Sequence, residues 1–352
     1  SGCSTSMSLE VSTSDSDIEH DEGMHHIPHA PQGPRSGRPQ AFRRPGRLRK
    51  VDEAHTEAST SSNFTCLYTD EDEVAQIDRD DLTWMEKVGT GITAEVFRGM
   101  WKGQTVAIKQ LNLTKRTCMM VKQQVAFCRE TNVAAKIRHA NLVQFHGVSF
   151  DCQPYLMITE FMSGGTVFEL LHCDESVELQ WRQQLRMCSD VASAMDYLHK
   201  FKPQIIHRDL KSLNLLLSKA IAGPLDVPEV KVSDFGLAKM KEDTDDWGKM
   251  TAAAGTFHWM APEVHTGHYN EKADVYSYAM VLYEIICCEV PFQDLEAAEV
   301  PAAVSSGTRP DLDCVPDDCP DRLKELMILC WAQDHSQRPS FTQILTVLNA
   351  TI

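Results

Sequence analysis

Two short motifs, held at a fixed spacing, constrain this chain more than any other feature of its sequence. The first is the run HRDLKSLN at residues 207–214, and the second is the run DFG at residues 234–236, which begins twenty-five positions after Asp209. Together they supply carboxylates, an amide and a lysine, the side chains that hold Mg²⁺ and neutralise phosphate oxygens. The spacing therefore predicts a site that aligns a hydroxyl group with a magnesium-bound phosphate.

Each polar residue of these motifs has a distinct expected role. Asp209 is placed to orient the hydroxyl and accept its proton. Asn214 and Asp234 carry the hard oxygen atoms that bind Mg²⁺. Lys211 would steady the phosphate that is transferred. Either tripeptide alone would more often be a structural coincidence, so the inference depends on further parts being present.

Those further parts lie upstream in a consistent order. Lys109 ends the alternating run VAIK, which is typical of a strand that delivers a cation to phosphates. Glu130 lies in the segment 121–137, which we expect to be helical, and we predict that it pairs with Lys109 because an unpaired buried charge is costly. Before them, residues 88–96 form a glycine-containing turn in which Ala94 stands at the third glycine position.

With these motifs in register, residues 82–348 resemble a eukaryotic protein kinase domain of the tyrosine-kinase-like group, similar to the mixed-lineage and Raf-like serine/threonine kinases. The subgroup is suggested by three stretches: residues 99–109, residues 249–263, and the segment from Cys319 to Pro339. Within the family, Lys211 and Thr256 mark serine/threonine specificity. Dual specificity stays open, as does a weakly active kinase or pseudokinase-type scaffold.

The resemblance implies an α+β, two-lobed protein kinase fold. A small antiparallel β-sheet lobe with one helix would span about 82–162, and a larger, mainly helical lobe about 163–352, within a domain covering 78–352. The strands of the smaller lobe are expected around 82–88, 94–99, 105–110, 142–149 and 155–160. Residues 218–229 contain Gly223-Pro224 and Pro228, so we predict a loop there between two short strands.

The resemblance also implies ATP and Mg²⁺ as cofactors, with Mn²⁺ as an alternative metal. The catalytic residues would be Asp209, Lys211, Lys109 and Glu130, and the metal ligands Asn214 and Asp234. Thr159 would be the gatekeeper, before a hinge at 160–162 that binds adenine. The expected nucleotide-binding residues are Val88, Gly89, Gly91, Val96, Ala107, Lys109, Thr159, Glu160, Met162 and Leu216.

Further expectations concern the support of the active state. Glu263 should pair with Arg338, and Asp274 should hold the backbone beside His207. An apolar column would join the lobes, formed by the four residues Phe145, Ala134, Phe235 and His207. Because Ala134 is smaller than the side chain usual in the family, we expect Phe145 to fill the space.

The resemblance further predicts activation by phosphorylation, through an upstream kinase or through autophosphorylation in trans. Thr251 is the expected phosphosite, while Thr256 would be a fixed partner of Asp209 and Lys211. Arg208 is expected to be free to take the phosphate bidentately. Protein substrates are the expected partners.

Composition agrees with a cytoplasmic enzyme: 42% of the residues are hydrophobic, and no apolar run is long enough to span a membrane. The first residues lack the pattern of a signal peptide. Twelve cysteines occur without paired spacing, and we expect them to be reduced core thiols, with Cys287 and Cys288 in a buried helix.

Residues 1–77 are rich in Ser, Pro and charge, and we expect a disordered tail. The net charge of −16 argues against general nucleic-acid binding. Residues 35–50 are a basic exception that could dock on anionic lipid, RNA or an acidic partner, and the alternative is a solvated tail.

Overall fold

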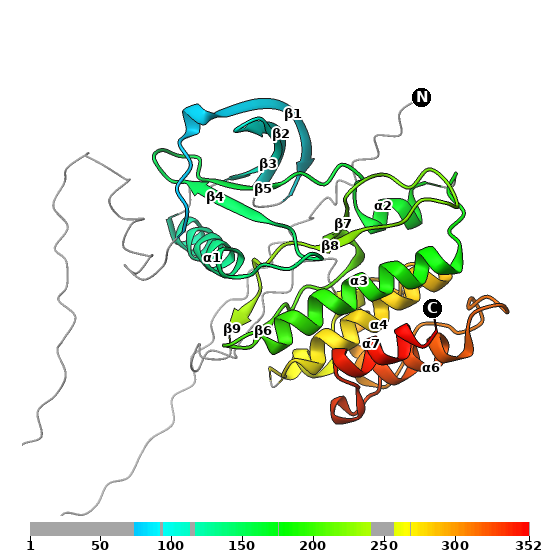
Figure 1. Cartoon of the computed structure of the whole chain (residues 1–352). Coiled ribbons are helices and arrows are strands. Elements are labelled where there is room, and N and C mark those ends of the chain that lie inside the picture. Colours follow the sequence, from blue (N-terminus) through cyan, green and yellow to red (C-terminus); the bar gives the residue numbers. More distant parts are fainter. Residues whose placement is uncertain are drawn as a thin grey trace, which may run out of the picture. The chain divides into compact units, whose positions relative to one another are not determined.

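A five-stranded antiparallel sheet forms the smaller lobe (Figure 1). The computed structural model describes residues 74–91, 94–112, 117–174, 176–240, 257–267 and 269–351. The strand order is β1-β2-β3-β5-β4. The five strands are β1 (Leu82–Thr90), β2 (Ala94–Trp101), β3 (Gln104–Leu111), β4 (Phe145–Ser149) and β5 (Leu156–Glu160). All five expected strands are confirmed, although β4 begins three residues later than the predicted start at Leu142.

Local turn chemistry explains the tight hairpin between β2 and β3. Lys102 and Gly103 have φ values of 49° and 79°, and they connect the paired residues Trp101 and Gln104. Two consecutive residues with positive φ match the right-handed twist of the flanking strands, which is why glycine is favoured here. The hairpin fixes the register that carries Lys109 in β3.

The boundary of the tail needs a correction. The predicted tail includes residues 74–77, but Gln76 bridges Val148 of β4, and the Ile77 amide donates to the Val148 carbonyl at 2.7 Å. Ile77 is only 3% exposed, because it packs in a small core with Leu82 and Val106. The remainder of the predicted tail lies outside the described residues.

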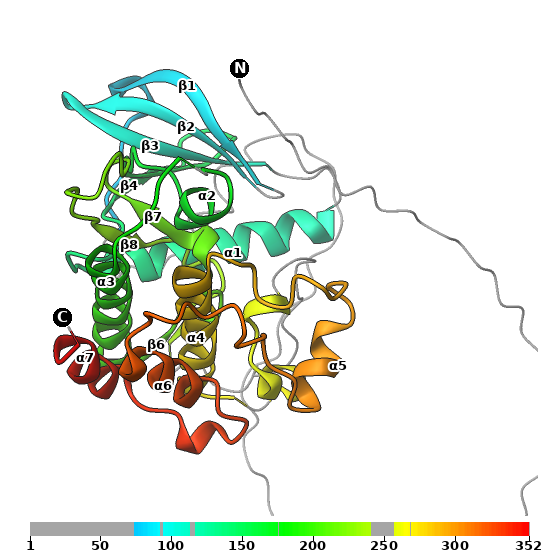
Figure 2. The same cartoon turned by 90° about the vertical axis from the view of Figure 1, so that its right-hand side faces the viewer.

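One helix, α1 (Thr117–Lys136), accompanies the sheet, as predicted, and begins four residues before the expected start. It packs beside β4 in both views (Figures 1 and 2). Phe127, Val133 and Ile137 are each 3% exposed and join the main core. Glu130, in the same helix, is 5% exposed, so its charge requires a partner.

The larger lobe is mainly helical, as expected, and is built around two long helices, α3 (Trp181–Lys200) and α4 (Lys272–Cys287). Most of α4 is buried, and α3 packs closely on α7 (Figure 2). The other helices are α2 (Val167–His172), α5 (Val300–Ser305), α6 (Asp321–Cys330) and α7 (Phe341–Asn349).

Two pairs of short strands bring the predicted motifs together. β6 (Ile205–Ile206) pairs with β9 (Lys239–Met240), and β7 (Leu215–Leu217) pairs with β8 (Val230–Val232). The first pair lies directly before the HRDLKSLN run and after the DFG run. The loop predicted at 218–229 connects β7 to β8, so that expectation is confirmed.

The expectation for the cysteines is only partly right. The nine described cysteines are free, but only four of them are buried: Cys128, Cys188, Cys319 and Cys330. Cys287 ends α4, and Cys288 follows it with a φ of 54° and is exposed, so the pair is not inside a buried helix. Within the described ranges, no helix is both long and apolar enough to cross a membrane.

Candidate active site

One face of the smaller-lobe sheet gathers the side chains predicted to contact a nucleotide. Val96 lies opposite Lys109 across β2 and β3, and Ala107 lies opposite Thr159 across β3 and β5. Since side chains alternate along a strand, these four share one face. Ile108, between Ala107 and Lys109, and Val106, directly before Ala107, are fully buried in the small core on the other face. The alternation thus separates a structural face from a candidate binding face.

The turn between β1 and β2 carries the remaining small-lobe residues of the predicted site. Gly89 lies opposite Val96 in the register, and the Gly91 amide donates to the Ala94 carbonyl at 2.8 Å. Val88, directly before Gly89, is 46% exposed. Ile92 and Thr93 lie outside the described residues.

Lys109 pairs with Glu130, as predicted, and also lies near Asp234. Its Nζ is 2.5 Å from Oε1 of Glu130 and 3.9 Å from Oδ1 of Asp234. Burial alone would lower the pKa of Lys109, but the attraction of Asp234 and Glu130 outweighs it and holds the pKa above its usual value. The Lys109 ammonium in turn keeps the pKa of the Asp234 carboxyl below its usual value. The site therefore holds a cation beside an ionised carboxylate.

The HRDLKSLN run folds back on itself around Asp209. Nζ of Lys211 lies 2.9 Å from Oδ2 of Asp209. The Asn214 amide donates to the Asp209 carbonyl at 2.7 Å and to its Oδ2 at 3.0 Å. Both bonds use Nδ2 of Asn214, so they do not occupy its amide oxygen. Asp209, Lys211 and Asn214 are thus brought together, as the sequence predicted.

Asp274 of α4 holds the backbone beside His207, as expected. The Asp274 carboxylate is fully buried and accepts from the amides of His207 and Arg208, both at 2.9 Å. It also accepts from Nε2 of His199 at 2.8 Å. Burial alone would raise the pKa of Asp274, but these donors and the charge of the histidines hold it below its usual value. Arg208 has a φ of 67°, a conformation that costs energy and therefore needs such support.

All four residues of the predicted apolar column are buried. The rings of His207 and Phe235 meet edge to face at 5.4 Å between centroids. Ala134 and Phe145 are 4% and 3% exposed and belong to the same core cluster as Phe235.

The predicted pair of Glu263 and Arg338 is also formed. The two nitrogens of the guanidinium donate to the two carboxylate oxygens at 2.5 Å and 2.9 Å. Arg338 is 1% exposed and also donates to the carbonyls of Ala332 and Lys272. This bidentate pair anchors Glu263, four residues after Trp259, to Arg338 in the larger lobe.

At the predicted hinge, the side chain of Glu160 has a role that the sequence did not indicate. Both of its carboxylate oxygens accept from Nζ of Lys231 in β8 at 2.8 Å. Its Oε1 also accepts from the backbone amide of Gln144 at 2.7 Å. The Glu160 amide itself donates to the Gln144 carbonyl. Met162 is 9% exposed, and Leu216 of β7 is half-buried. Lys231 thus ties the hinge to the strand that precedes Asp234.

A buried acid in α4 was also missed. Glu284 of α4 is fully buried and accepts from the Ser212 hydroxyl at 2.5 Å and from the Trp259 indole at 2.6 Å. Its position inside the apolar run 275–286 was the available signal, because a charge buried in such a helix must be paired. Glu284 thereby joins the residue after Lys211 to the segment before Glu263.

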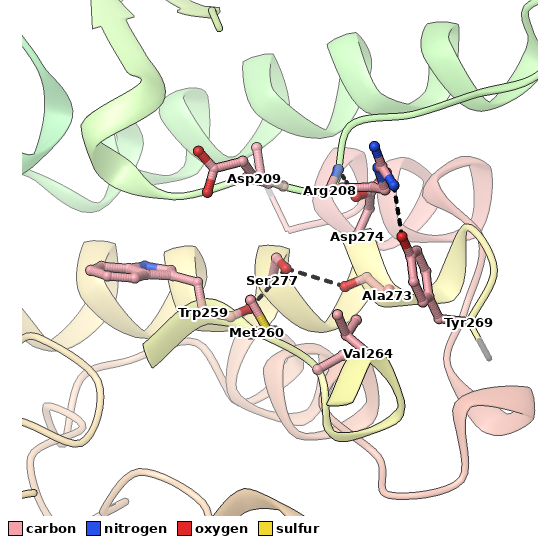
Figure 3. Close-up of a pocket in the computed structure, with 11 residues that line it drawn as sticks. Arg208, Asp209, Trp259, Met260, Val264, Tyr269, Ala273, Asp274 and Ser277 are labelled. Atoms are coloured by element: carbon pink, nitrogen blue, oxygen red, sulfur yellow. Dashed lines mark hydrogen bonds between the residues drawn. The ribbon is translucent and has the colours of Figure 1, made fainter. Parts of the chain in front are cut away.

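The expectation that Arg208 is free was wrong. Its Nε donates to the Leu237 carbonyl, and its Nη1 donates to the Tyr269 hydroxyl at 2.9 Å (Figure 3). The cavity beside these residues measures about 10 Å³, room for no more than about one water molecule, so it is not a ligand pocket. Thr251, Thr256 and the basic block 35–50 lie outside the described residues.

Comparisons with known proteins agree with this geometry. Residues 82–348 match the family described as protein tyrosine and serine/threonine kinase. The chain is 37% identical over 286 residues to the serine/threonine-protein kinase STY17 of Arabidopsis thaliana, covering 81% of this chain and 47% of that protein. It is 38% identical over 264 residues to the serine/threonine-protein kinase VIK of the same plant, covering 73% and 57%.

A third relative has a different printed specificity. The dual specificity protein kinase pyk3 of Dictyostelium discoideum is 37% identical over 275 residues, covering 78% of this chain and 19% of that protein. The chain thus spans less than two thirds of the length of each of these relatives. The family predicted from the sequence is confirmed: the chain belongs to the protein tyrosine and serine/threonine kinase family.

Proposed function

We propose that this chain is an active serine/threonine protein kinase that transfers the γ-phosphate of ATP to protein hydroxyl groups. The observation that carries the proposal is the convergence of three charged residues from separate elements. Lys109 of β3 lies within 2.5 Å of Glu130 in α1 and 3.9 Å of Asp234, which follows β8. This arrangement fixes the Lys109 ammonium beside Asp234, where it would contact the phosphates of a bound ATP.

The roles of the side chains follow from their positions. Asp209 would orient the substrate hydroxyl and accept its proton, because its carboxylate is fixed by Lys211 and Asn214. Lys211 would move onto the transferred phosphate, and Lys109 would hold the other phosphates. The binding face with Val96, Ala107 and Thr159 would cover the adenine, together with Met162 and Leu216.

The residues present fit a magnesium ion. Asn214 and Asp234 offer an amide oxygen and an ionised carboxylate, and the Asp234 side chain is 45% exposed, so its oxygens can be reached. The described residues contain no cluster of three or more His, Cys, Asp or Glu suited to a metal. That is expected for Mg²⁺, which proteins bind through one or two side chains together with substrate phosphates and water. When bound, the ion would neutralise charge on the phosphate oxygens.

The alternative function is a scaffold with weak or no transfer. Such a protein usually lacks the lysine, the aspartate or a metal ligand, and here Lys109, Asp209, Asn214 and Asp234 are all present. Transfer of radiolabelled phosphate from Mg-ATP to arrays of Ser, Thr and Tyr peptides tests both points. Labelling of Ser or Thr peptides that is lost in Asp209→Asn supports the proposal. Tyr labelling at a similar rate would indicate dual specificity.

Regulation and context extend the proposal. We place the regulatory phosphate on Thr251, added by an upstream kinase or by a second copy in trans, and the enzyme in the cytoplasm. Because Arg208 already has two partners, the phosphate would have to share or replace one of them. The basic block 35–50 would dock an anionic or acidic partner. Loss of activation in Thr251→Ala, measured after incubation with Mg-ATP, tests the phosphosite.

A further inference from the structure

Arg208 occupies a strained position next to the proposed catalytic base. Its φ of 67° lies in the left-handed region, which costs a residue with a Cβ energy relative to the right-handed region. The strain is borne by contacts on both sides of the residue. The Asp274 carboxylate holds the main chain through the amides of His207 and Arg208, both at 2.9 Å. The remaining contacts are made by the Arg208 side chain, which bonds to Leu237 and Tyr269.

The side chain of Arg208 joins two segments that are distant in sequence. Its Nε donates to the carbonyl of Leu237, which directly follows the DFG run. Its Nη1 donates to the hydroxyl of Tyr269 at 2.9 Å, from a residue 61 positions further along the chain. Leu237 lies before residues 241–256, and Tyr269 lies after them. One guanidinium thus connects Leu237, near the start of the activation segment (residues 234–263), with Tyr269, which follows the end of that segment. Figure 3 shows the bond to Tyr269.

The position of Tyr269 allows its hydroxyl to contact Arg208. It lies between the turn at Pro262–Thr266 and the start of α4, and it is 8% exposed. The cavity lined by Tyr269, Arg208 and Val264 measures about 10 Å³, and the hydrogen bond from Arg208 to the Tyr269 hydroxyl is partly buried. A hydrogen bond from a charged donor is stronger than a neutral one.

We propose that Tyr269 is a positioning residue whose hydroxyl holds Arg208, and through it the loop carrying Asp209, while the activation segment bears no phosphate. This inference rests on the proposed kinase function for its kinetic consequence. The hydroxyl supplies an oxygen acceptor where a phosphate would supply a charged one. A phosphorylated segment could take over the same guanidinium, so the hydroxyl matters most in the unphosphorylated protein.

The decisive variant is Tyr269→Phe, which keeps the ring and removes only the hydroxyl group that accepts from Arg208. Tyr276→Phe is the matched control, because Tyr276 is also buried and its hydroxyl has no hydrogen-bond partner among the described residues. In phosphatase-treated full-length protein, we expect Tyr269→Phe to lower kcat about tenfold while KM for ATP stays unchanged. Tyr276→Phe should retain wild-type kcat. A merely structural role would lower the active fraction and the melting temperature instead.

A double-mutant cycle identifies the group through which Tyr269 acts. In an Arg208→Met background, Tyr269→Phe should have no further effect on kcat, because its partner is gone. After phosphorylation of the segment, the loss in Tyr269→Phe should shrink. Wild-type kcat in Tyr269→Phe, or an undiminished loss in the Arg208→Met background, would overturn the proposal.

Hydrogen exchange at the amides of residues 207–211 provides a test that needs no activity. We expect faster exchange in Tyr269→Phe than in wild type and Tyr276→Phe, and equal exchange in all three proteins would refute the inference. If wild type shows no phosphoryl transfer, the proposed function fails while this readout still decides the role of Tyr269. Should Tyr269→Phe not fold, Arg208→Lys, which cannot reach both partners, is expected to show the same faster exchange.

Discussion

Nζ of Lys109 lies 2.5 Å from Oε1 of Glu130, and this contact joins β3 to α1 within the smaller lobe. Glu130 is 5% exposed, and Lys109 is the cation that compensates its buried charge, while both Asp234 and Glu130 compensate the charge of Lys109. The pair also sets the position of the lysine relative to Asp234. Its geometry is the basis of the first prediction.

Lys109→Met should lower kcat/KM for phosphoryl transfer about hundredfold or more, because it removes a fixed cation from the phosphate site. Glu130→Gln should cost about tenfold, since Asp234 still attracts the lysine. Steady-state kinetics with a peptide substrate measure both. Lys200→Met, which removes an exposed lysine paired with Asp196 on α3, serves as the control and should retain full activity. A Lys109→Met enzyme with near-normal kcat/KM would exclude the assigned role.

The second prediction concerns the buried pair of Glu263 and Arg338. Arg338→Met should lower the free energy of unfolding by about 3–5 kcal/mol, because it leaves a carboxylate and two carbonyls without their donor. Denaturant titration followed by fluorescence measures the change. Arg322→Met, at an exposed position of α6, should stay within about 0.5 kcal/mol of wild type. A change at Arg338 as small as at Arg322 would contradict the account.

The third prediction tests whether Phe145 compensates for the small Ala134. Both residues are buried in one core, so Ala134→Leu should overfill it and Phe145→Leu should underfill it, each costing about 1–3 kcal/mol. The double variant restores much of the volume and should cost less than the sum by at least about 0.5 kcal/mol. Strictly additive losses in thermal unfolding would show that the two side chains do not share a space.

The fourth prediction is a pH dependence of stability. Burial lowers the pKa of His139 below its usual value of 6.5, although Asp196 partly opposes the shift. The unfolded chain therefore binds the proton more readily than the folded one near that pH. Stability should fall as the pH is lowered through about 6.5.

The structure explains why protonation of His139 is unfavourable. Its Nδ1 accepts from the Asn141 amide at 3.1 Å, and an imidazolium cannot accept a hydrogen bond. His139→Asn keeps an acceptor and removes the titration, so its free energy of unfolding should depend less on pH between about 7.5 and 5.5. His146 and His265, whose pKa values burial also lowers, would account for the slope that remains. An unchanged slope in His139→Asn would argue against this assignment.

Much of the fold and site could be predicted because the informative residues lie close together in the sequence. The VAIK strand, the buried acid at Glu130 and the two polar runs each have a composition that implies their environment. Once the family was recognised, the pairs Lys109 with Glu130 and Glu263 with Arg338 could be expected, and both are formed.

The contacts that were missed join residues whose separation carries no pattern. Tyr269 and Arg208 are 61 positions apart, and Lys231 and Glu160 are 71 apart. Neither Tyr269 nor Lys231 lies in a motif, and neither residue type implies a particular partner, so only the packed structure reveals their contacts. Arg208 was expected to be free for the same reason, because its partners are a main-chain carbonyl and a distant hydroxyl.

The most direct test of the central claim is the rate of phosphoryl transfer from Mg-ATP to a Ser or Thr peptide by wild type and Asp209→Asn, at matched occupancy by ATP. We expect transfer by wild type and a loss of at least about hundredfold in Asp209→Asn, with ATP binding retained in both. Equal rates in the two proteins, or no transfer by wild type that binds Mg-ATP and carries a phosphorylated activation segment, would contradict it.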